Sequence, residues 1–394
     1  MSLALPLSTS GRFIVDARGR RVRLAGVNWA GASEDMGVPV GLDQVNRSTL
    51  AELIAAMGFN SVRFPFSLWM TEQSHPVPDQ YLAANQDLYG KTPMEVYDAC
   101  VRALTGAGLI VIPNCHLLDY GWCCSTGDEN GLWFNDRWPA QKFTQAWQGI
   151  AKRYASNPLI AAMDIKNEPR EATVGAHVLT PTWGTGGQTD IAAMYTTVGN
   201  LIHEIAPGPL IICEGLNYAT SLAGVASHPI RLTRPGKVVY SMHDYSWDHA
   251  QGQSQAAYAE QMNKTGGYIL TEKIAPLWIG ELGDNTGSLA TFGLAEPSQP
   301  DGAPPVGWWI NLQAWLTEAD VDWCWWALNP THGTSITPPT GPVKYNWGDP
   351  EPYGLLASNW TAAGSPALMK MLLSLTQPHM GPGVGQGAPP PGAT

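Results

Sequence analysis

The chain has 394 residues, which suits one large α/β barrel or two ordinary domains. Its 22 basic and 33 acidic side chains give a formal net charge of −11, which argues against nucleic acid and anionic membranes as partners. No window of about 18 apolar residues predicts a membrane span, and residues 1–10 lack the basic start and long apolar run of a signal peptide. We therefore expect a soluble chain from which any export signal has already been removed.

The first predicted element is a β-hairpin. Alternating residues in Arg12–Val15 and Arg21–Leu24 flank a glycine-containing turn at Asp16–Gly19. This hairpin is expected to cap one end of the domain that follows.

Beyond the hairpin, short apolar segments alternate with segments of helical periodicity. Eight strands are predicted, at Leu24–Trp29, Ser61–Phe66, Leu109–His116, Ala161–Glu168, Leu210–Gly215, Val238–Tyr245, Leu277–Gly283 and Val321–Asn329. Helices are predicted between them, among others at Thr49–Met57, Pro93–Gly106, Gln141–Tyr154, Ile191–Ile205 and Trp308–Glu318. This alternation predicts an α/β fold of the (β/α)₈ TIM-barrel type. A doubly wound open sheet is disfavoured because no Gly-rich phosphate loop follows the first strand.

The barrel is predicted to occupy residues 1–380 as one domain. Long polar loops at Arg170–Asp190, Asp284–Val306 and Thr331–Tyr353 suit the walls of a cleft. Residues 381–394 are rich in proline and glycine and have little to bury, so they are predicted to form a linker.

Chemistry in such barrels lies at the C-terminal ends of the strands. The residues predicted there are Trp29, Arg63, His116, Asn167, Glu168, Glu214, His243, Tyr245, Glu281 and Trp326. Glu168 and Glu281 each end an apolar run. Hydrolysis of a glycosidic bond needs two carboxyl groups, one as acid and one as nucleophile or base. We therefore predict that Glu168 and Glu281 are the catalytic pair.

Six cysteines show neither the paired spacing of a zinc site nor the density of a small disulfide scaffold. Cys100 and Cys213 fall on apolar patterns and are predicted core residues. Cys123 and Cys124 could bridge to each other, or one of them could pair with Cys115, so the connectivity and the redox compartment stay open.

The ordered series of strand-end motifs resembles family 5 of the glycoside hydrolases (clan A), from about Arg12 to about Gln377. The resemblance is carried by Asn167-Glu168-Pro169 after the fourth strand, Gly280-Glu281-Leu282-Gly283 after the seventh, Arg63, His116, His243, Tyr245, Asn85-Gln86-Asp87-Leu88 and Trp326-Ala327-Leu328-Asn329-Pro330. The chain looks most like the catalytic domains of secreted bacterial endo-β-1,4-glucanases, the cellulases. This resemblance implies an extracellular enzyme that hydrolyses cellulose or soluble β-glucans with retention of configuration.

The resemblance also implies roles for individual residues. Glu168 would act as acid and then as base, and Glu281 as the nucleophile. Asn167 would bind the 2-hydroxyl of the cleaved sugar, while Arg63 would keep Glu281 ionised and Tyr245 would donate a hydrogen bond to it.

Two histidines, His116 and His243, follow the family pattern as hydrogen-bonding partners of the substrate or of the carboxylates. No third ligand has a plausible spacing for a metal site, and the mechanism needs no cofactor, so none is predicted.

Tryptophan is abundant, with 17 residues, and most of them are expected in the core. Trp326 is predicted to form the floor beneath the cleaved sugar, with Trp29 as a neighbouring platform. Trp133 and Trp183 are predicted either to bind outlying sugars or to pack their loops. Trp325 is expected to point away from Trp326, because side chains alternate along a strand.

The same residues would serve a mannanase, a xyloglucanase or a small β-glycosidase, because loops choose the sugar. A non-catalytic carbohydrate-binding barrel is disfavoured because both glutamates are present. The expected partner is a β-glucan polysaccharide or oligosaccharide. The enzyme is expected to act as a monomer, with a carbohydrate-binding module as the possible continuation beyond the linker.

Overall fold

The computed structural model describes residues 3–250, 252–286, 307–336 and 343–379. The predicted linker at 381–394 and most of the predicted loop Asp284–Val306 lie outside these residues. None of the described helices is long and apolar enough to cross a bilayer.

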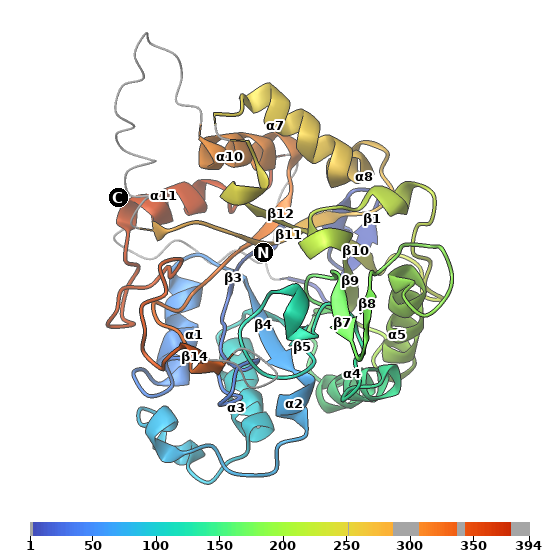
Figure 1. The fold of residues 1–394 in the computed structure, drawn as a ribbon. Helices are drawn as coiled ribbons and strands as arrows, with labels where there is room; N and C mark the ends of the chain where they lie inside the picture. The colour runs from blue at the N-terminus through green and yellow to red at the C-terminus, as the bar shows by residue number, and fades with distance from the viewer. Residues whose placement is uncertain (1–2, 251, 287–306, 337–342, 380–394) are drawn as a thin grey trace.

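Eight parallel strands close into a barrel, as the sequence predicts (Figure 1). They are β3 (Ala25–Asn28), β4 (Ser61–Ser67), β5 (Ile110–Leu117), β6 (Ala162–Asp164), β9 (Leu210–Glu214), β10 (Val238–Tyr245), β11 (Leu277–Gly283) and β12 (Asp322–Trp325). Their order around the barrel is β10-β11-β12-β3-β4-β5-β6-β9. Every residue of these strands except the first residue of β10 is buried, which is why the strands appear in the sequence as apolar runs without alternation.

Helices surround the barrel (Figure 1). They are α1 (Arg47–Ala56), α2 (Leu68–Thr71), α3 (Pro93–Gly106), α4 (Ala140–Tyr154), α5 (Ile191–Ile205), α6 (Leu216–Ala219), α7 (Gln255–Met262), α8 (Tyr268–Thr271), α10 (Trp308–Ala319) and α11 (Pro366–Ser374). Short 3₁₀ helices lie at Asp79–Leu82, Gln86–Leu88, Thr126–Asp128, Ala223–Ala226 and Ser246–Asp248, and a π-helical turn at Asn263–Gly267. The predicted bounds of α3 hold because Thr92 and Glu95 form a capping box around Pro93.

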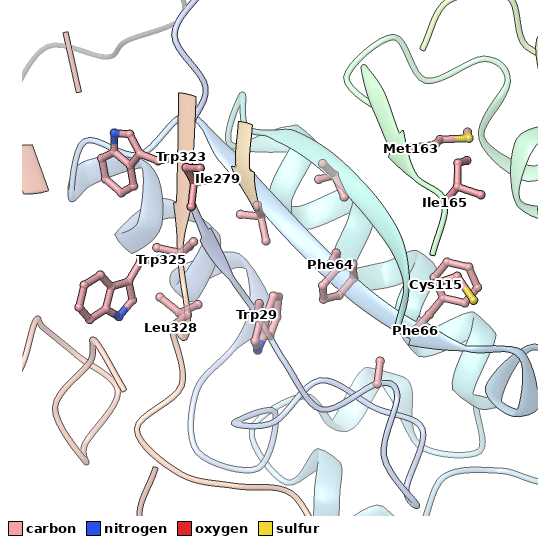
Figure 2. Packing of buried hydrophobic residues seen from close by; sticks show 14 of the residues in the cluster. Trp29, Phe64, Phe66, Cys115, Met163, Ile165, Ile279, Trp323, Trp325 and Leu328 are labelled. Carbon is pink, nitrogen blue, oxygen red and sulfur yellow. The ribbon is translucent and has the colours of Figure 1, made fainter. Parts of the chain in front are cut away.

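The buried apolar side chains of the barrel form two clusters, and alternate residues of a strand belong to different clusters. On β5, Ile110 and Ile112 belong to a smaller cluster that also contains Leu7 and Ile14, whereas Val111 belongs to the large cluster shared with the helices. Figure 2 shows part of the large cluster, with Trp29 beside Phe64. The N-terminal segment therefore covers the apolar end of the barrel, which leaves the opposite end for polar groups.

The N-terminal hairpin differs from the prediction. It consists of β1 (Ser8–Ser10) and β2 (Phe13–Val15), whereas the expected second strand makes only an isolated bridge from Val15 to Arg21. Burial of Arg21 against Asp322 explains the difference, because this segment is held by ion pairs to the start of β12 rather than by a strand partner.

Two predicted loops contain small hairpins of their own. The first is β7 (Ala172–Val174) with β8 (His177–Leu179), and the second is β13 (Ser335–Ile336) with β14 (Val343–Tyr345). Strand β6 is shorter than predicted because it ends at Asp164, four residues before Glu168. The chain therefore leaves the sheet before it reaches the first predicted glutamate.

Candidate active site

A cavity of about 490 Å³ opens where the C-terminal ends of the strands meet. Among its lining residues are six of those predicted for the site, namely His116, Asn167, Glu168, Tyr245, Glu281 and Trp326. Two further predicted residues, Arg63 and His243, are buried and contact the lining glutamates. The fold thus brings together eight side chains that are up to 263 positions apart in the sequence, from Arg63 to Trp326.

Glu281 lies on β11 and is held through both of its carboxylate oxygens. Oε1 accepts a hydrogen bond from Nη1 of Arg63 at 2.5 Å, and Oε2 accepts one from the hydroxyl of Tyr245 at 2.8 Å. Because a bond to each oxygen fixes both the position and the rotation of a carboxylate, Glu281 faces the cavity in one orientation.

Glu168 follows β6 in an irregular segment with a φ of 43°, in the left-handed region that side chains rarely adopt. Its backbone N–H donates to Oε2 of Glu214 at 2.7 Å, and its carbonyl accepts from Nη1 of Arg170 at 3.0 Å. These bonds hold the unusual backbone conformation, as expected where strain persists at a functional position.

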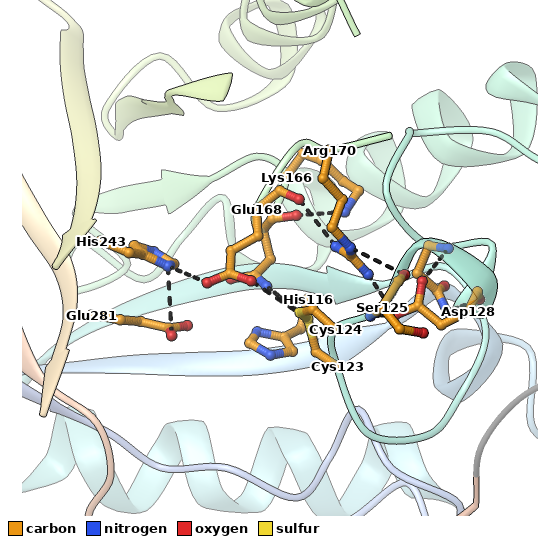
Figure 3. Close-up of a disulfide and its surroundings, with 12 residues drawn as sticks. His116, Cys123, Cys124, Ser125, Asp128, Lys166, Glu168, Arg170, His243 and Glu281 are labelled. Atoms are coloured by element: carbon orange, nitrogen blue, oxygen red, sulfur yellow. Dashed lines mark hydrogen bonds and ion pairs between the residues drawn. A yellow bond between two sulfur atoms is a disulfide. The ribbon is translucent and has the colours of Figure 1, made fainter. Parts of the chain in front are cut away.

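His243 joins the two predicted catalytic residues, as Figure 3 shows. Its Nδ1 lies 2.8 Å from Oε1 of Glu168 and 3.5 Å from Oε2 of Glu281. One ligand atom from each of these three side chains lies within 4.8 Å of the others. The two carboxyl groups are therefore close neighbours across the floor of the cavity.

Arg63 is the centre of the hydrogen-bond network and is fully buried. Besides Glu281, its guanidinium donates to Oδ2 of Asp164 at 2.7 Å, Oε1 of Glu214 at 2.9 Å, Oδ1 of Asn167 at 2.7 Å and Oδ1 of Asn28 at 3.0 Å. Burial opposes its charge, but Asp164 and Glu281 outweigh burial and raise the pKa of Arg63 well above its usual range. This permanent cation balances carboxylates that come from three strand ends.

Replacement of Arg63 by Met is expected to lower the free energy of unfolding by about 3–5 kcal/mol, because buried carboxylates lose their counter-ion. Urea unfolding followed by circular dichroism measures the change. Arg153→Met is the matched control: its bidentate pair with Asp98 is 40% exposed on the arginine side, so the expected cost is below about 1 kcal/mol. Equal costs for the two variants would contradict the role given to Arg63.

Burial raises the pKa of Glu281 above 4.5, although the positive charges of His243 and Arg63 oppose the shift. Burial also works against the charged form of His243, but Glu281 and Glu214 outweigh it and raise the pKa of His243 well above 6.5. A cationic His243 therefore donates Nδ1–H to Glu168 and lies beside Glu281, whose negative charge it stabilises.

His116 behaves differently from His243. Burial and the charge of Arg63 lower its pKa well below 6.5, so the ring is neutral. Nδ1 lies 3.0 Å from Oδ1 of Asn114, and the ring stacks on Trp326 with centroids 5.4 Å apart. His116 is thus bonded to Asn114 rather than to one of the catalytic-site carboxylates.

The adjacent residues Cys123 and Cys124, which Figure 3 shows, form a disulfide that is contacted by Asn167. Its side-chain N–H group donates to Sγ of Cys123 at 3.6 Å and approaches Sγ of Cys124 at 4.0 Å. Sγ of Cys123 also lies 3.7 Å from Oε2 of Glu168. Of the two pairings that the sequence leaves open, the structure has the one between Cys123 and Cys124. Cys115 is a buried free thiol.

Within the described residues, two sets of three side chains are close enough to hold a metal ion, namely Glu168 with His243 and Glu281, and Glu168 with Cys123 and Cys124. In the first set, the donor atoms already bind one another, Arg63 and Tyr245. In the second set, both sulfur atoms are joined in the disulfide, which leaves no thiolate ligand.

Trp326 lines the cavity, whereas the prediction of a sugar platform at Trp29 is wrong. Trp29 is fully buried, lies beside Phe64 with ring centroids 5.3 Å apart (Figure 2) and donates Nε1–H to the carbonyl of Val40. Strand parity explains the error: Asn28 points into the barrel toward Arg63, so the next side chain points outward. By the same rule Trp325 is buried in the outer layer, as predicted.

Trp133 and Trp183 pack their loops, which was the alternative to sugar binding. Each is only 7% exposed and neither lines the cavity. Nε1 of Trp183 donates to the carbonyl of His228 at 2.9 Å, and its ring lies beside Tyr195. Their assignment to outlying sugar subsites is therefore wrong.

Other cavity residues were not predicted. Trp247 is 64% exposed and stacks on Tyr245 with centroids 4.4 Å apart, and Trp122 lies on the loop before the disulfide. Glu214, which the sequence places at a strand end without a catalytic role, does not line the cavity but holds Arg63 and the backbone of Glu168 beneath it. Trp247 could have been found from its position two residues after the end of β10, whereas nothing in the pattern around Trp122 marks it.

A closed barrel that carries two carboxyl groups side by side at the C-terminal ends of its strands defines the class of barrel glycoside hydrolases. Residues 15–332 match the family model described as cellulase (glycosyl hydrolase family 5). The chain belongs to this family and is a glycoside hydrolase, as its resemblance to family 5 implies.

Relatives support the same assignment. The chain is 27% identical over 397 residues to an endoglucanase of Paenibacillus polymyxa, covering 94% of this chain and 88% of the relative. It is 29% identical to a glycosyl hydrolase 5 family protein of Chamaecyparis obtusa, covering 97% and 68%. A hyperthermophilic endocellulase of Pyrococcus horikoshii shares the fold, with a TM-score of 0.75, 23% identity, and coverage of 96% of this chain and 100% of that one.

Proposed function

We propose that this chain is a retaining endo-β-1,4-glucanase in which Glu168 is the acid/base and Glu281 the nucleophile. The observation that carries the proposal is the proximity of the two carboxyl groups, within 4.8 Å at their nearest atoms. Retaining glycosidases place these groups about 5 Å apart, whereas inverting enzymes separate them by about 6.5–9.5 Å to admit a water molecule.

The surroundings of each glutamate support its role. Glu281 is bonded to Arg63 and Tyr245, so it is oriented to attack the anomeric carbon while its negative charge is balanced. Glu168 protonates the leaving oxygen, which breaks the glycosidic bond as Glu281 forms an ester to the sugar. Glu168, again a carboxylate, then removes a proton from water, which hydrolyses that ester.

Asn167 is placed to bind the 2-hydroxyl of the cleaved sugar, a bond that strengthens in the transition state. Its Oδ1 accepts from Arg63 and its N–H group faces the disulfide, so the amide is held in one rotation. Beneath the sugar, the indole of Trp326 offers an apolar face to the axial C–H groups of a pyranose.

A glucan substrate is supported by the names of relatives, several of which are endoglucanases. Structures of the Pyrococcus horikoshii endocellulase include complexes with cellotetraose. Mannan or xyloglucan remains the alternative within the family, because it is the loops that select the sugar. Cys123–Cys124, a disulfide in contact with the site, also supports action outside the reducing cytosol, in line with a secreted protein.

The function is tested on carboxymethylcellulose, glucomannan and xyloglucan, with viscosity and reducing ends measured together. We expect a steep fall in the viscosity of carboxymethylcellulose with few new ends, since internal cleavage shortens chains faster than it creates ends. Faster hydrolysis of glucomannan or xyloglucan would mean that one of those polymers is the preferred substrate. Binding without hydrolysis of any of the three polymers would favour a non-catalytic barrel.

A further inference from the structure

The disulfide between Cys123 and Cys124 is a reactive group that the mechanism above does not use. Both residues line the cavity and are partly exposed, so small molecules in the cavity can reach the sulfur atoms. The other four cysteines are fully buried free thiols, namely Cys100, Cys115, Cys213 and Cys324. A reductant that enters the cavity therefore acts on the bond between Cys123 and Cys124.

Reduction of this bond is a balanced two-electron step when the reductant is a phosphine. The phosphine gives two electrons to the disulfide and takes the oxygen atom of one water molecule, which makes it a phosphine oxide. The two protons of that water molecule go to the two sulfur atoms. The products are a thiol on Cys123 and a thiol on Cys124, and each thiol can exchange its proton for a metal cation, since the thiolate is the form that binds metals.

The loop that carries the two cysteines is tied to Glu168 by contacts other than the disulfide (Figure 3). Arg170 is buried, donates Nη1–H to the carbonyl of Glu168 at 3.0 Å and forms an ion pair with Asp128. Oδ2 of Asp128 also accepts the backbone N–H of Ser125, the residue after Cys124, at 3.0 Å. Reduction leaves these contacts in place, so we expect the two thiols to stay beside Glu168.

The two sulfur atoms and Glu168 have the spacing of metal ligands. One donor atom from each of the three residues lies within 4.8 Å of the others. Sγ of Cys123 lies 3.7 Å from Oε2 of Glu168. On a tetrahedral zinc ion, bonds of about 2.3 Å to sulfur and about 2.0 Å to oxygen place these two ligands roughly 3.5 Å apart. The sulfur atoms must separate to about 3.8 Å to share one ion, which only cleavage of the disulfide permits.

Oε2 is also the oxygen that Glu168 needs for its proposed chemistry. Nδ1 of His243 lies 2.8 Å from Oε1, so Oε2 is the oxygen that can pass a proton to the leaving group. A cation bound to Oε2 takes the place of that proton. Two thiolates select a thiophilic cation such as Zn²⁺ or Cd²⁺ over Mg²⁺ or Ca²⁺, which prefer oxygen ligands.

We propose that reduction of the Cys123–Cys124 disulfide creates a binding site for a thiophilic divalent cation, held by the two thiolates and Oε2 of Glu168, and that the bound cation stops hydrolysis. The disulfide form is the active enzyme, and the reduced form is inactive while the cation is bound. The inhibition rests on the proposed function, because it takes Glu168 to be the acid/base, whereas cation binding does not depend on it.

Cation binding is tested on wild-type protein that has been reduced with a water-soluble phosphine and separated from it by gel filtration under nitrogen. Titration with Cd²⁺ should show binding of one cation per chain and an ultraviolet charge-transfer band from thiolate to cadmium. The oxidised protein should show no such band, because it has no accessible thiolate.

Two variants locate the site. In the reduced state, Glu168→Gln should weaken Zn²⁺ binding by more than about tenfold, since even residues that only support metal ligands contribute about 10–100-fold. Cys100→Ala is the matched control: it removes a buried thiol on α3, so the reduced variant should bind Zn²⁺ as the wild type does.

Inhibition is tested on carboxymethylcellulose. With Zn²⁺ at about ten times its dissociation constant, about one-eleventh of the reduced enzyme stays free of metal, so the rate should fall about tenfold and return when a chelator is added. The oxidised wild type should stay within about twofold of its rate without Zn²⁺. The double variant Cys123→Ser, Cys124→Ser should likewise keep its own metal-free rate, in reducing and in oxidising buffer.

Three results would overturn the proposal: no cadmium band in the reduced protein, equal Zn²⁺ affinity of the oxidised and reduced forms, or full activity of the reduced enzyme when Zn²⁺ is bound. Loss of the native circular dichroism spectrum on reduction would overturn it too, because the site requires the loop to stay beside Glu168. If the oxidised wild type hydrolyses no glycoside, the proposed function fails. The cadmium titration still decides the metal site in that case, so the two failures are distinguishable.

Discussion

Replacement of Glu281 by Gln is expected to lower kcat by about 10⁴-fold or more on every substrate, including aryl glycosides with good leaving groups. A neutral amide cannot form the ester to the anomeric carbon, and no better leaving group repairs that defect. The amide can still bond to Arg63 and Tyr245, so the variant should keep the fold. Steady-state rates on carboxymethylcellulose and on an activated aryl cellobioside measure the loss.

Two controls make this result interpretable. Glu72→Gln applies the same substitution in an exposed ion pair outside the cavity and should leave the rates unchanged. Thermal unfolding should show that Glu281→Gln is folded at the assay temperature. Substantial hydrolysis of the aryl cellobioside by this variant would mean that another group is the nucleophile.

Replacement of Glu168 by Gln should produce a loss that depends on the leaving group. On cellulose derivatives kcat should fall by about 10³-fold, because an alkoxide leaves poorly without a proton donor. On an activated aryl cellobioside the first step needs little protonation and should survive. The second step still lacks its base, so an initial burst of phenol followed by slow turnover is expected in stopped-flow measurements.

Azide provides a second measurement for the Glu168 variant. As an anionic nucleophile it needs no general base, so it should restore steady turnover of the aryl cellobioside and yield a glycosyl azide of retained configuration. An equal fall in rate on activated and unactivated substrates, with no burst and no rescue, would remove the acid/base role from Glu168.

Much of the barrel could be predicted because its strands are buried on both faces. The bounds of β10, β11, α3 and α5 agree with the sequence pattern, since each is a continuous apolar run or an amphipathic repeat with a clear start. The hairpin could not be placed, because Arg21 and Arg23 look like the alternating residues of a strand. They instead form buried ion pairs with Asp320 and Asp322, contacts about 300 positions away that no local pattern reveals.

The candidate site was predicted best where strand ends fixed the residues. Arg63, Tyr245 and Glu281 lie on strands, so their direction follows from parity and register. The alternation of side chains along β3 also directs Trp29 away from the cavity, although the prediction of a sugar platform at Trp29 did not take this alternation into account. Trp122 and Glu34 lie on loops, and the fold alone decides which loop residues turn toward the cavity.

The Cys123–Cys124 disulfide illustrates the same limit. Adjacent cysteines left two pairings open, and only the path of their loop brings them to Asn167 and Glu168. The sequence shows which cysteines are present, whereas their contact with Glu168 depends on how the segments that follow β5 and β6 pack together.

The central claim is that Glu281 forms a covalent bond to the sugar, and mass spectrometry of a trapped intermediate tests it most directly. The wild type is incubated with an activated cellobioside carrying fluorine in place of the 2-hydroxyl of the reacting sugar, which slows the second step more than the first. Peptide mapping should then find one glycosyl group on the peptide that contains Glu281, and on that residue. A label on a different carboxylate, or rapid turnover of ordinary substrates with release of the inverted anomer, would contradict the account.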